Sequence, residues 1–240
     1  MTVHTVRPRR IRIPVMFFKR RYPTAQRWPA VWPVPRVRHR APRAALMAAT
    51  SFTLACSSKL PPELGDIPTG LRVSLITRYY DVSGMSPHDL EVAMVMRGPE
   101  VEGHPRYAAT SFQIRWSFSV RASSVGCVAQ TPRIELEMAE HLPRWTDRDR
   151  ADEELRARWD TFFEAVRTHE RGHQQRNVDG ARHMLRVLGA ANSAGGCTVL
   201  RESANTRMRE MLAQVHNDNH RYDVQTGGGA RAGVRWPPPR

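Results

Sequence analysis

The chain has 240 residues, with 37 Lys and Arg against 23 Asp and Glu and a formal net charge of +14. This length allows one domain of ordinary size plus a tail. Residues 1–43 hold twelve Lys and Arg and no acid, so residues 56–240 carry only +2. The net charge therefore gives no reason to class the folded part among nucleic-acid-binding proteins, and we expect no nucleic-acid partner.

Residues 1–55 are predicted to be a basic leader followed by a signal peptide. Residues 1–43 contain seven prolines, and such a segment buries too little apolar surface to offset its ordering entropy. Basic residues up to Arg43 then precede twelve uncharged, mostly apolar residues, Ala44 to Ala55, which is the layout of an export signal. Twelve helical residues rise about 18 Å, too little to cross a bilayer core of about 30 Å. A basic nucleic-acid arm is the alternative.

Cys56 is the predicted lipidation site. Leu54-Ala55-Cys56 resembles the lipobox of bacterial lipoproteins, although Thr53 stands where leucine is usual. We expect a lipoprotein of the periplasm or outer membrane, attached to the membrane through Cys56; ordinary secretion and a cytosolic chain are the alternatives. Because residues 1–36 add no signal feature, either translation begins near Val37 or everything before Cys56 is removed.

The other two cysteines, Cys127 and Cys197, are the only pair left if Cys56 carries lipid. In an oxidising compartment they are expected to form a disulfide. Two buried free thiols are the alternative.

The chain after Cys56 begins with a predicted linker, residues 56–70, which is rich in Pro and Gly. Residues 71–82 are predicted to form a strand. Ser86-Pro87-His88-Asp89 is typical of a helix start, with a capping Ser, Pro at the first position and an acid at the third. Gly98-Pro99 is expected to end this helix.

Residues 111–121 give the clearest strand prediction. Apolar side chains alternate with polar ones at five successive pairs of positions, which indicates a half-buried antiparallel strand. Residues 134–138 repeat the pattern, and the turn-like residues 123–126 lie between the two segments. We therefore expect these strands to pair as neighbours.

From Thr146 the apolar period becomes helical. Thr146 and Asp149 are a plausible capping pair, and an apolar stripe runs from Leu155 through His169 to His173. A helix over residues 146–188 would be about 64 Å long, against a compact diameter of about 40 Å, so a break is expected near Gly180. Another helix is predicted over residues 203–217.

The expected fold is α+β, with a small antiparallel sheet packed against the long motif-bearing helix and a further C-terminal helix. The domain is expected to span residues 71–234, followed by a tail at 235–240.

His169-Glu170-Arg171-Gly172-His173 is a His-Glu-x-x-His motif on this long helix. Residues four apart on a helix lie about 6 Å from each other, so both imidazoles can reach one zinc ion. Glu170, about 100° round the helix from His169, can act as the general base for water at that ion. Two core histidines that match by chance are the alternative.

The chain resembles the bacterial family of predicted secreted zinc-dependent proteases, over about residues 71–234. The likeness rests on Tyr79 to Gly84, Arg97-Gly98-Pro99, Leu142 to Trp145, the zinc motif and Tyr222 to Thr226, together with Trp116, Cys127, Trp159 and Cys197. This resemblance implies an exported α+β domain with a disulfide and a peptidase activity. The family's closing segment carries a histidine where this chain has Gly228, a departure that puts full activity in question.

The third metal ligand is not assigned by the sequence. Five residues are candidates, and the segment 216–223 is preferred among them: Asp179, Glu202, His216, His220 and Asp223. An unbroken helix would carry Asp179 about 9 Å beyond His173, out of reach.

The sequence as a whole predicts an exported zinc-dependent hydrolase of peptide or amide bonds. His169 and His173 are the expected ligands, Glu170 the expected base, and a peptide or protein of the cell envelope the expected substrate. A non-catalytic envelope lipoprotein with a structural or degenerate metal site is the alternative.

Overall fold

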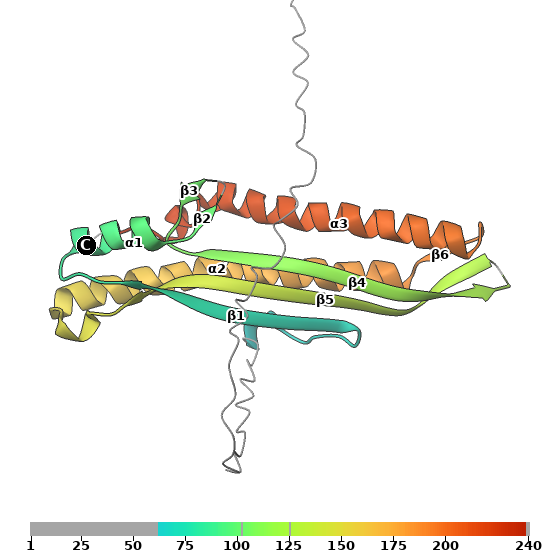
Figure 1. The fold of residues 1–240 in the computed structure, drawn as a ribbon, viewed down its shortest axis with the longest axis horizontal. Helices are drawn as coiled ribbons and strands as arrows, with labels where there is room; N and C mark the ends of the chain where they lie inside the picture. The colour runs from blue at the N-terminus through green and yellow to red at the C-terminus, as the bar shows by residue number, and fades with distance from the viewer. Residues whose placement is uncertain (1–61, 102, 125, 239–240) are drawn as a thin grey trace, which may run out of the picture. The chain divides into compact units, whose positions relative to one another are not determined.

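The computed structural model describes residues 62–101, 103–124 and 126–238. The predicted leader and Cys56 lie outside this range, so they stay predictions. The described part is a mixed α/β domain (Figure 1) whose main elements follow in the order β1 (Leu71–Val82), α1 (Pro87–Arg97), β2 (Glu100–Val101), β3 (His104–Pro105), β4 (Ala109–Ser123), β5 (Gly126–Trp145), α2 (Glu153–Gly189), β6 (Asn192–Ser193) and α3 (Cys197–Thr226). Short 3-10 helices lie at Pro62–Leu64, Arg148–Arg150 and Ala230–Ala232.

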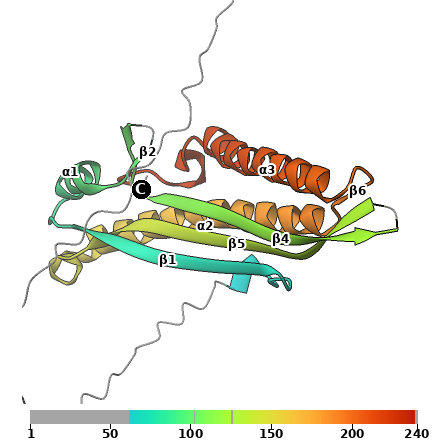
Figure 2. The same ribbon diagram turned by 45° about the vertical axis from the view of Figure 1, so that its right-hand side comes forward.

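The main sheet has the strand order β1-β5-β4, and β6 pairs with the beginning of β5. The expected pairing of β4 with β5 is confirmed as antiparallel, with Trp116 opposite Ile134. The expected combination of helices with a small sheet is confirmed. The expected antiparallel direction is wrong for β1, which runs parallel to β5, with Leu71 also opposite Ile134. The two reversals from β1 to β4 and from β4 to β5 bring β5 back in the direction of β1, and β5 then lies between the other two (Figure 2).

Helix α1 begins as its sequence predicts. The Ser86 side chain accepts a hydrogen bond from the amide of Asp89, and Pro87 is the first helical residue. Gly98 caps the other end, and Leu90 and Met94 are completely buried. A Cβ at Gly98 would lie 2.4 Å from the Arg106 carbonyl oxygen, so this glycine lets the chain pass close behind the helix.

Helix α2 begins later than expected. Strand β5 continues to Trp145, and the amide and hydroxyl of Thr146 both donate to the Val82 carbonyl instead of capping a helix. Asp152 is the N-cap, and its carboxylate accepts a hydrogen bond from the Leu155 amide at 2.7 Å. Thr146 is therefore tied to the end of β1, which explains why the local capping signal was misleading.

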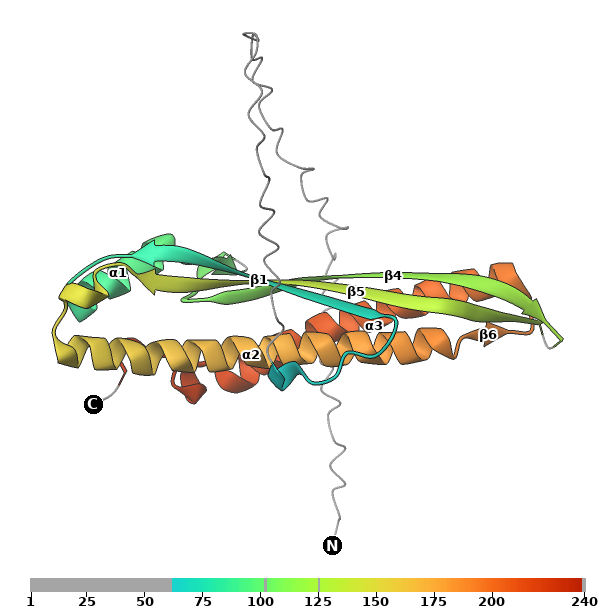
Figure 3. The same cartoon turned by 90° about the horizontal axis from the view of Figure 1, so that it is seen from below.

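The expected break at Gly180 is wrong, because α2 is continuous over 37 residues. Such a helix is about 55 Å long, and the 20 residues of β5 extend over about 66 Å. The strand runs along most of the helix (Figure 3). Gly180 has a packing role instead. A Cβ there would lie 2.3 Å from Val215 Cγ2, so the absence of a side chain lets α3 approach α2 closely.

Helix α3 is longer than the predicted 203–217, since it runs from Cys197 to Thr226. It returns along α2: Val215 packs at Gly180, and Tyr222 packs at Gly172. Position 222 on α3 is thus level with position 172 on α2, and the two helices are antiparallel neighbours.

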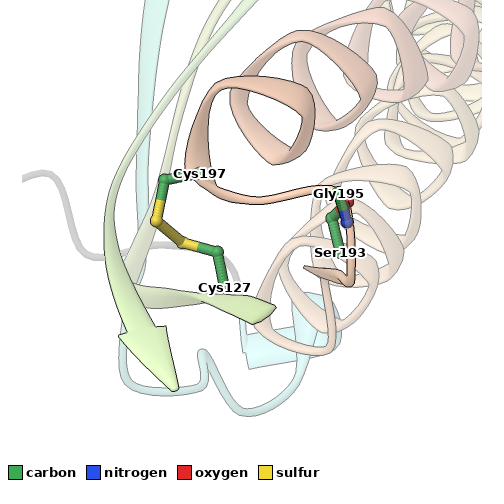
Figure 4. Close-up of a disulfide and its surroundings, with 4 residues drawn as sticks. All are labelled: Cys127, Ser193, Gly195 and Cys197. Carbon is green, nitrogen blue, oxygen red and sulfur yellow. Dashed lines mark hydrogen bonds between the residues drawn. A yellow bond between two sulfur atoms is a disulfide. The ribbon is translucent and has the colours of Figure 1, made fainter. Parts of the chain in front are cut away.

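Cys127 and Cys197 form a disulfide, as one of the two sequence interpretations predicts. It joins the second residue of β5 to the first residue of α3 (Figure 4). Strand β6 passes close to this end of β5, since a Cβ at Gly126 would lie 2.2 Å from the Ser193 carbonyl oxygen. The bridge therefore holds the beginning of α3 against the sheet.

Packed residues extend beyond 71–234 on both sides. Leu64, in the predicted linker, is buried, and Arg182 donates to the carbonyls of Leu64 and Asp66. In the predicted tail, Trp236 is buried and its indole donates to the Pro87 carbonyl at 2.7 Å. Within the described range, no helix is both long and apolar enough to cross a membrane.

Candidate metal centre

Two separate apolar cores lie along α2, and a buried polar segment lies between them. The first core includes helix residues as far as Val166, and the second begins on this helix at Val178. All the buried polar side chains in the described part of the chain fall within this gap: His169, Glu170, His173, Gln174 and Asn177. Burying polar groups costs free energy unless they are satisfied, so this cluster is a candidate functional site.

The histidine pair lies where the helical spacing predicts. His169 and His173 are 5% and 7% exposed, and their Nε2 atoms lie 3.3 Å apart. Their rings are almost perpendicular, with centroids 4.8 Å apart. Both imidazoles therefore direct the same nitrogen toward one point.

Asp223, on α3, supplies a carboxylate at that point. Its Oδ1 lies 3.2 Å from His169 Nε2 and 3.1 Å from His173 Nε2. No other group of three or more His, Cys, Asp or Glu within the described residues is arranged to hold a metal ion. Of the five candidate third ligands, Asp223, within the preferred segment 216–223, is the one that the structure brings to the histidine pair.

The three donor atoms have the spacing of a tetrahedral metal site. A tetrahedral zinc ion with bonds of about 2.0–2.1 Å keeps neighbouring donors about 3.3 Å apart, and the three distances here are 3.1, 3.2 and 3.3 Å. Two imidazoles and a carboxylate are also donors that zinc accepts. The residues present therefore fit such an ion.

The electrostatics of the three groups favour a cation among them. Burial favours the neutral acid, but hydrogen bonds with both histidines outweigh it and hold the pKa of Asp223 well below its usual range. Burial disfavours the charged imidazole of His173, yet its contacts with Asp223 and Asn219 raise its pKa. A carboxylate that stays ionised beside two imidazole nitrogens attracts positive charge, whether a proton or a metal ion.

Glu170 lies beside this group without belonging to it. Its side chain is buried, and Oε2 accepts a hydrogen bond from the Thr110 hydroxyl at 2.7 Å. Burial raises the pKa of Glu170, although the bond from Thr110 and the charges of His173 and His169 oppose that change. Glu170 is therefore a carboxylate fixed on one oxygen and able to accept a proton more readily than an exposed glutamate.

Tyr222 covers the histidine pair from α3. Its ring stacks on His169, with centroids 4.9 Å apart and planes 15° apart. The Arg176 guanidinium lies on this ring, 3.6 Å from its centroid. A Cβ at Gly172 would come within 2.2 Å of the Tyr222 hydroxyl. The glycine inside the motif is thus needed for the tyrosine to pack over the site.

The remaining candidate ligands point elsewhere. Glu202 and His220 are exposed. Asp179 is bound to Arg182 and Gln175 at the surface, as expected for an unbroken helix. His216 stacks on Phe112 of β4, with ring centroids 4.6 Å apart.

Gly228 occupies a turn just beyond α3. Its φ is +63°, and its amide donates to the Asp223 carbonyl at 2.8 Å. A Cβ at this position would lie 3.2 Å from Arg106 Nη1. The position at which relatives are expected to carry a histidine therefore borders Arg106.

Several residues of the site were not predicted. Thr110 faces α2 because it lies opposite Glu140, which accepts a hydrogen bond from Gln174. Its place in the inward phase of the β4 alternation was a usable signal. Asn177 lies four residues after His173, where the apolar stripe continues. A polar residue at such a buried position was a second usable signal. Asn219 and Tyr222 lie within the preferred segment 216–223, and Tyr222 belongs to the family likeness, but the sequence assigned neither of them a role in the site.

The fold and the site together define a class: a mixed α/β domain with a helical histidine pair and a carboxylate from a second helix. The chain belongs to the family described as "Bacterial protein of unknown function (DUF922)", whose model matches residues 77–229. That range contains His169, Glu170, His173, Asp223 and both bridged cysteines. No curated protein and no solved structure matches the chain.

Proposed function

We propose that this protein is an exported zinc-dependent hydrolase of peptide or amide bonds. The observation that carries the proposal is the convergence of His169 Nε2, His173 Nε2 and Asp223 Oδ1 at tetrahedral spacing, beside a buried glutamate. The likeness to predicted secreted zinc-dependent proteases supports the same conclusion. The lipid anchor at Cys56 and the envelope location are part of the proposal.

Three protein donors are what a catalytic site requires. Structural zinc sites are closed by four protein ligands, whereas catalytic sites keep one position open. Within the described residues the group has three donors, and the Asp223 side chain is 37% exposed. This arrangement favours the hydrolase over an envelope lipoprotein with a structural metal.

When bound, zinc would supply Lewis acidity, lowering the pKa of a bound water to about 7 and polarising a carbonyl. Glu170 would take a proton on Oε1, which accepts no hydrogen bond from the described residues, while Thr110 holds Oε2. Its raised pKa makes it a stronger base than an exposed glutamate, which suits a group that accepts a proton and then returns it to a leaving amine. Tyr222 packs against both imidazole rings and so keeps them in place.

The change of Glu170 to Gln tests this assignment. The amide keeps the shape of the side chain and removes the base, so hydrolysis should fall by about 10²-fold or more. Zinc content should not change, because Glu170 is not a ligand. The measurement is cleavage of a fluorogenic peptide library by the full chain, with zinc determined on the same samples.

Glu202→Gln is the matched control, because Glu202 is an exposed glutamate of α3, and it should leave both quantities unchanged. A Glu170→Gln protein that cleaves as well as the wild type would exclude Glu170 as the base. A zinc-loaded wild type that cleaves no peptide or amide would favour the non-catalytic lipoprotein.

A further inference from the structure

Behind His173, on the side away from the metal group, lies a pair of amides, the half-buried Asn219 and the buried Asn177. His173 Nδ1 is 2.8 Å from Asn219 Oδ1. The Asn219 amide group donates at 2.9 Å to the Val215 carbonyl and at 2.7 Å to Asn177 Oδ1. Asn177 is completely buried on α2, so the pair connects α2 and α3 beneath the site.

The Val215 carbonyl determines which way the Asn219 amide faces. A backbone carbonyl can only accept, so the Asn219 atom beside it must be Nδ2. Both protons of that nitrogen are then used, by Val215 and by Asn177. The atom that faces His173 is consequently Oδ1, which is only an acceptor, and His173 Nδ1 must carry the proton in order to bond with it.

This proton position decides what His173 presents to the site. With the proton of the neutral ring on Nδ1, the lone pair lies on Nε2, which faces Asp223 Oδ1 at 3.1 Å. The opposite tautomer would place a proton on Nε2, where it would donate to Asp223 and close the metal position. Asp223 alone favours that blocked tautomer, so some other group must oppose it.

We propose that Asn219 is a positioning residue for the metal centre: it holds the His173 proton on Nδ1 and so directs the Nε2 lone pair at the ion. Asn177 supports it by fixing the amide orientation. This inference rests on the metal binding in the proposed function, but it also makes a claim about the metal-free protein. Removal of a group that orients a histidine ligand in this way typically lowers metal affinity by about 10–100-fold.

A set of Asn219 variants of the full chain separates this role from simple helix packing. Asn219→Leu is close to isosteric and removes the acceptor, so Zn²⁺ affinity in a chelator competition titration should fall by about 10–100-fold. Asn219→Asp keeps an acceptor oxygen for Nδ1 but loses the protons that Nδ2 donates to Val215 and Asn177, so its Zn²⁺ affinity should lie between those of wild type and Asn219→Leu. Asn217→Leu, at an exposed asparagine two residues away, is the matched control and should have no effect. If Asn219→Leu does not fold, Asn219→Ser, whose side chain is too short to reach Nδ1, replaces it.

Imidazole ¹⁵N NMR of the same proteins gives a readout that packing alone would not change. In metal-free wild type, at a pH where the His173 ring is neutral, Nδ1 should carry the proton, and in Asn219→Leu this proton should move to Nε2. A wild-type His173 with a bare Nδ1, or a leucine variant that keeps wild-type affinity and tautomer, would overturn the inference. If the wild type binds no Zn²⁺, the proposed function fails, and the tautomer comparison in metal-free protein still decides the role of Asn219.

Discussion

Replacement of Asp223 by Ala is expected to abolish tight zinc binding, as is replacement of either motif histidine. Each change leaves only two of the three donor atoms that lie 3.1–3.3 Å apart. Loss of a residue that only orients a ligand lowers metal affinity by about 10–100-fold. Loss of a ligand itself should lower Zn²⁺ affinity by more than this, and hydrolysis should be lost as well. Isothermal or chelator competition titration of the full chain measures the change.

Two substitutions at rejected candidates serve as controls for this prediction. His216→Ala and Glu202→Ala remove a histidine and a glutamate that lie away from the donor group, so Zn²⁺ affinity should remain that of wild type. Added Zn²⁺ should raise the melting temperature of the wild type and of both controls, because an ion that binds only the native state stabilises it. An Asp223→Ala protein that still binds Zn²⁺ as tightly as wild type would show that the third ligand lies elsewhere.

Loss of the Cys127–Cys197 disulfide is expected to lower the free energy of unfolding by about 4 kcal/mol. The two cysteines are 70 residues apart in the sequence, and the chain-entropy model gives about this value for a loop of that length. The bridge also ties the first turn of α3 to β5, and α3 carries Asp223, so its loss should weaken Zn²⁺ binding in addition. Chemical denaturation of Cys127→Ala/Cys197→Ala against wild type measures the first effect.

Reduction provides the matched control for the disulfide. A reductant should lower the melting temperature of the wild type and leave that of the double variant unchanged, with Cys56 replaced by Ser in both. If peptide mapping under non-reducing conditions finds both cysteines of the wild type as free thiols, the alternative interpretation of the sequence holds.

Local patterns in the sequence were sufficient wherever one element determines the outcome. Helical spacing placed His169 and His173 on one face, because four residues are close to one helical turn. The capping pattern at Ser86 located the beginning of α1, since the bond to the Asp89 amide lies within four residues. The alternation of apolar and polar residues identified β4, because this pattern is also contained within a single element.

The sequence predictions that were wrong or incomplete concern features that depend on contacts between distant segments of the chain. Thr146 looked like a helix cap, but its hydroxyl bonds to Val82, 64 residues away. Gly180 looked like a break, but its role is to admit Val215 of α3. The third ligand required knowing that α3 returns antiparallel to α2, which brings residue 222 level with residue 172. No periodicity in the sequence carries that register.

The zinc content of the wild-type protein, purified from the cell envelope without chelators and determined by elemental analysis, tests the central claim most directly. The arrangement of His169, His173 and Asp223 predicts about one zinc per chain, and the His169→Ala/His173→Ala protein prepared in parallel should contain none. Wild-type protein that is free of zinc and takes up none when Zn²⁺ is added would contradict the assignment of a metal centre.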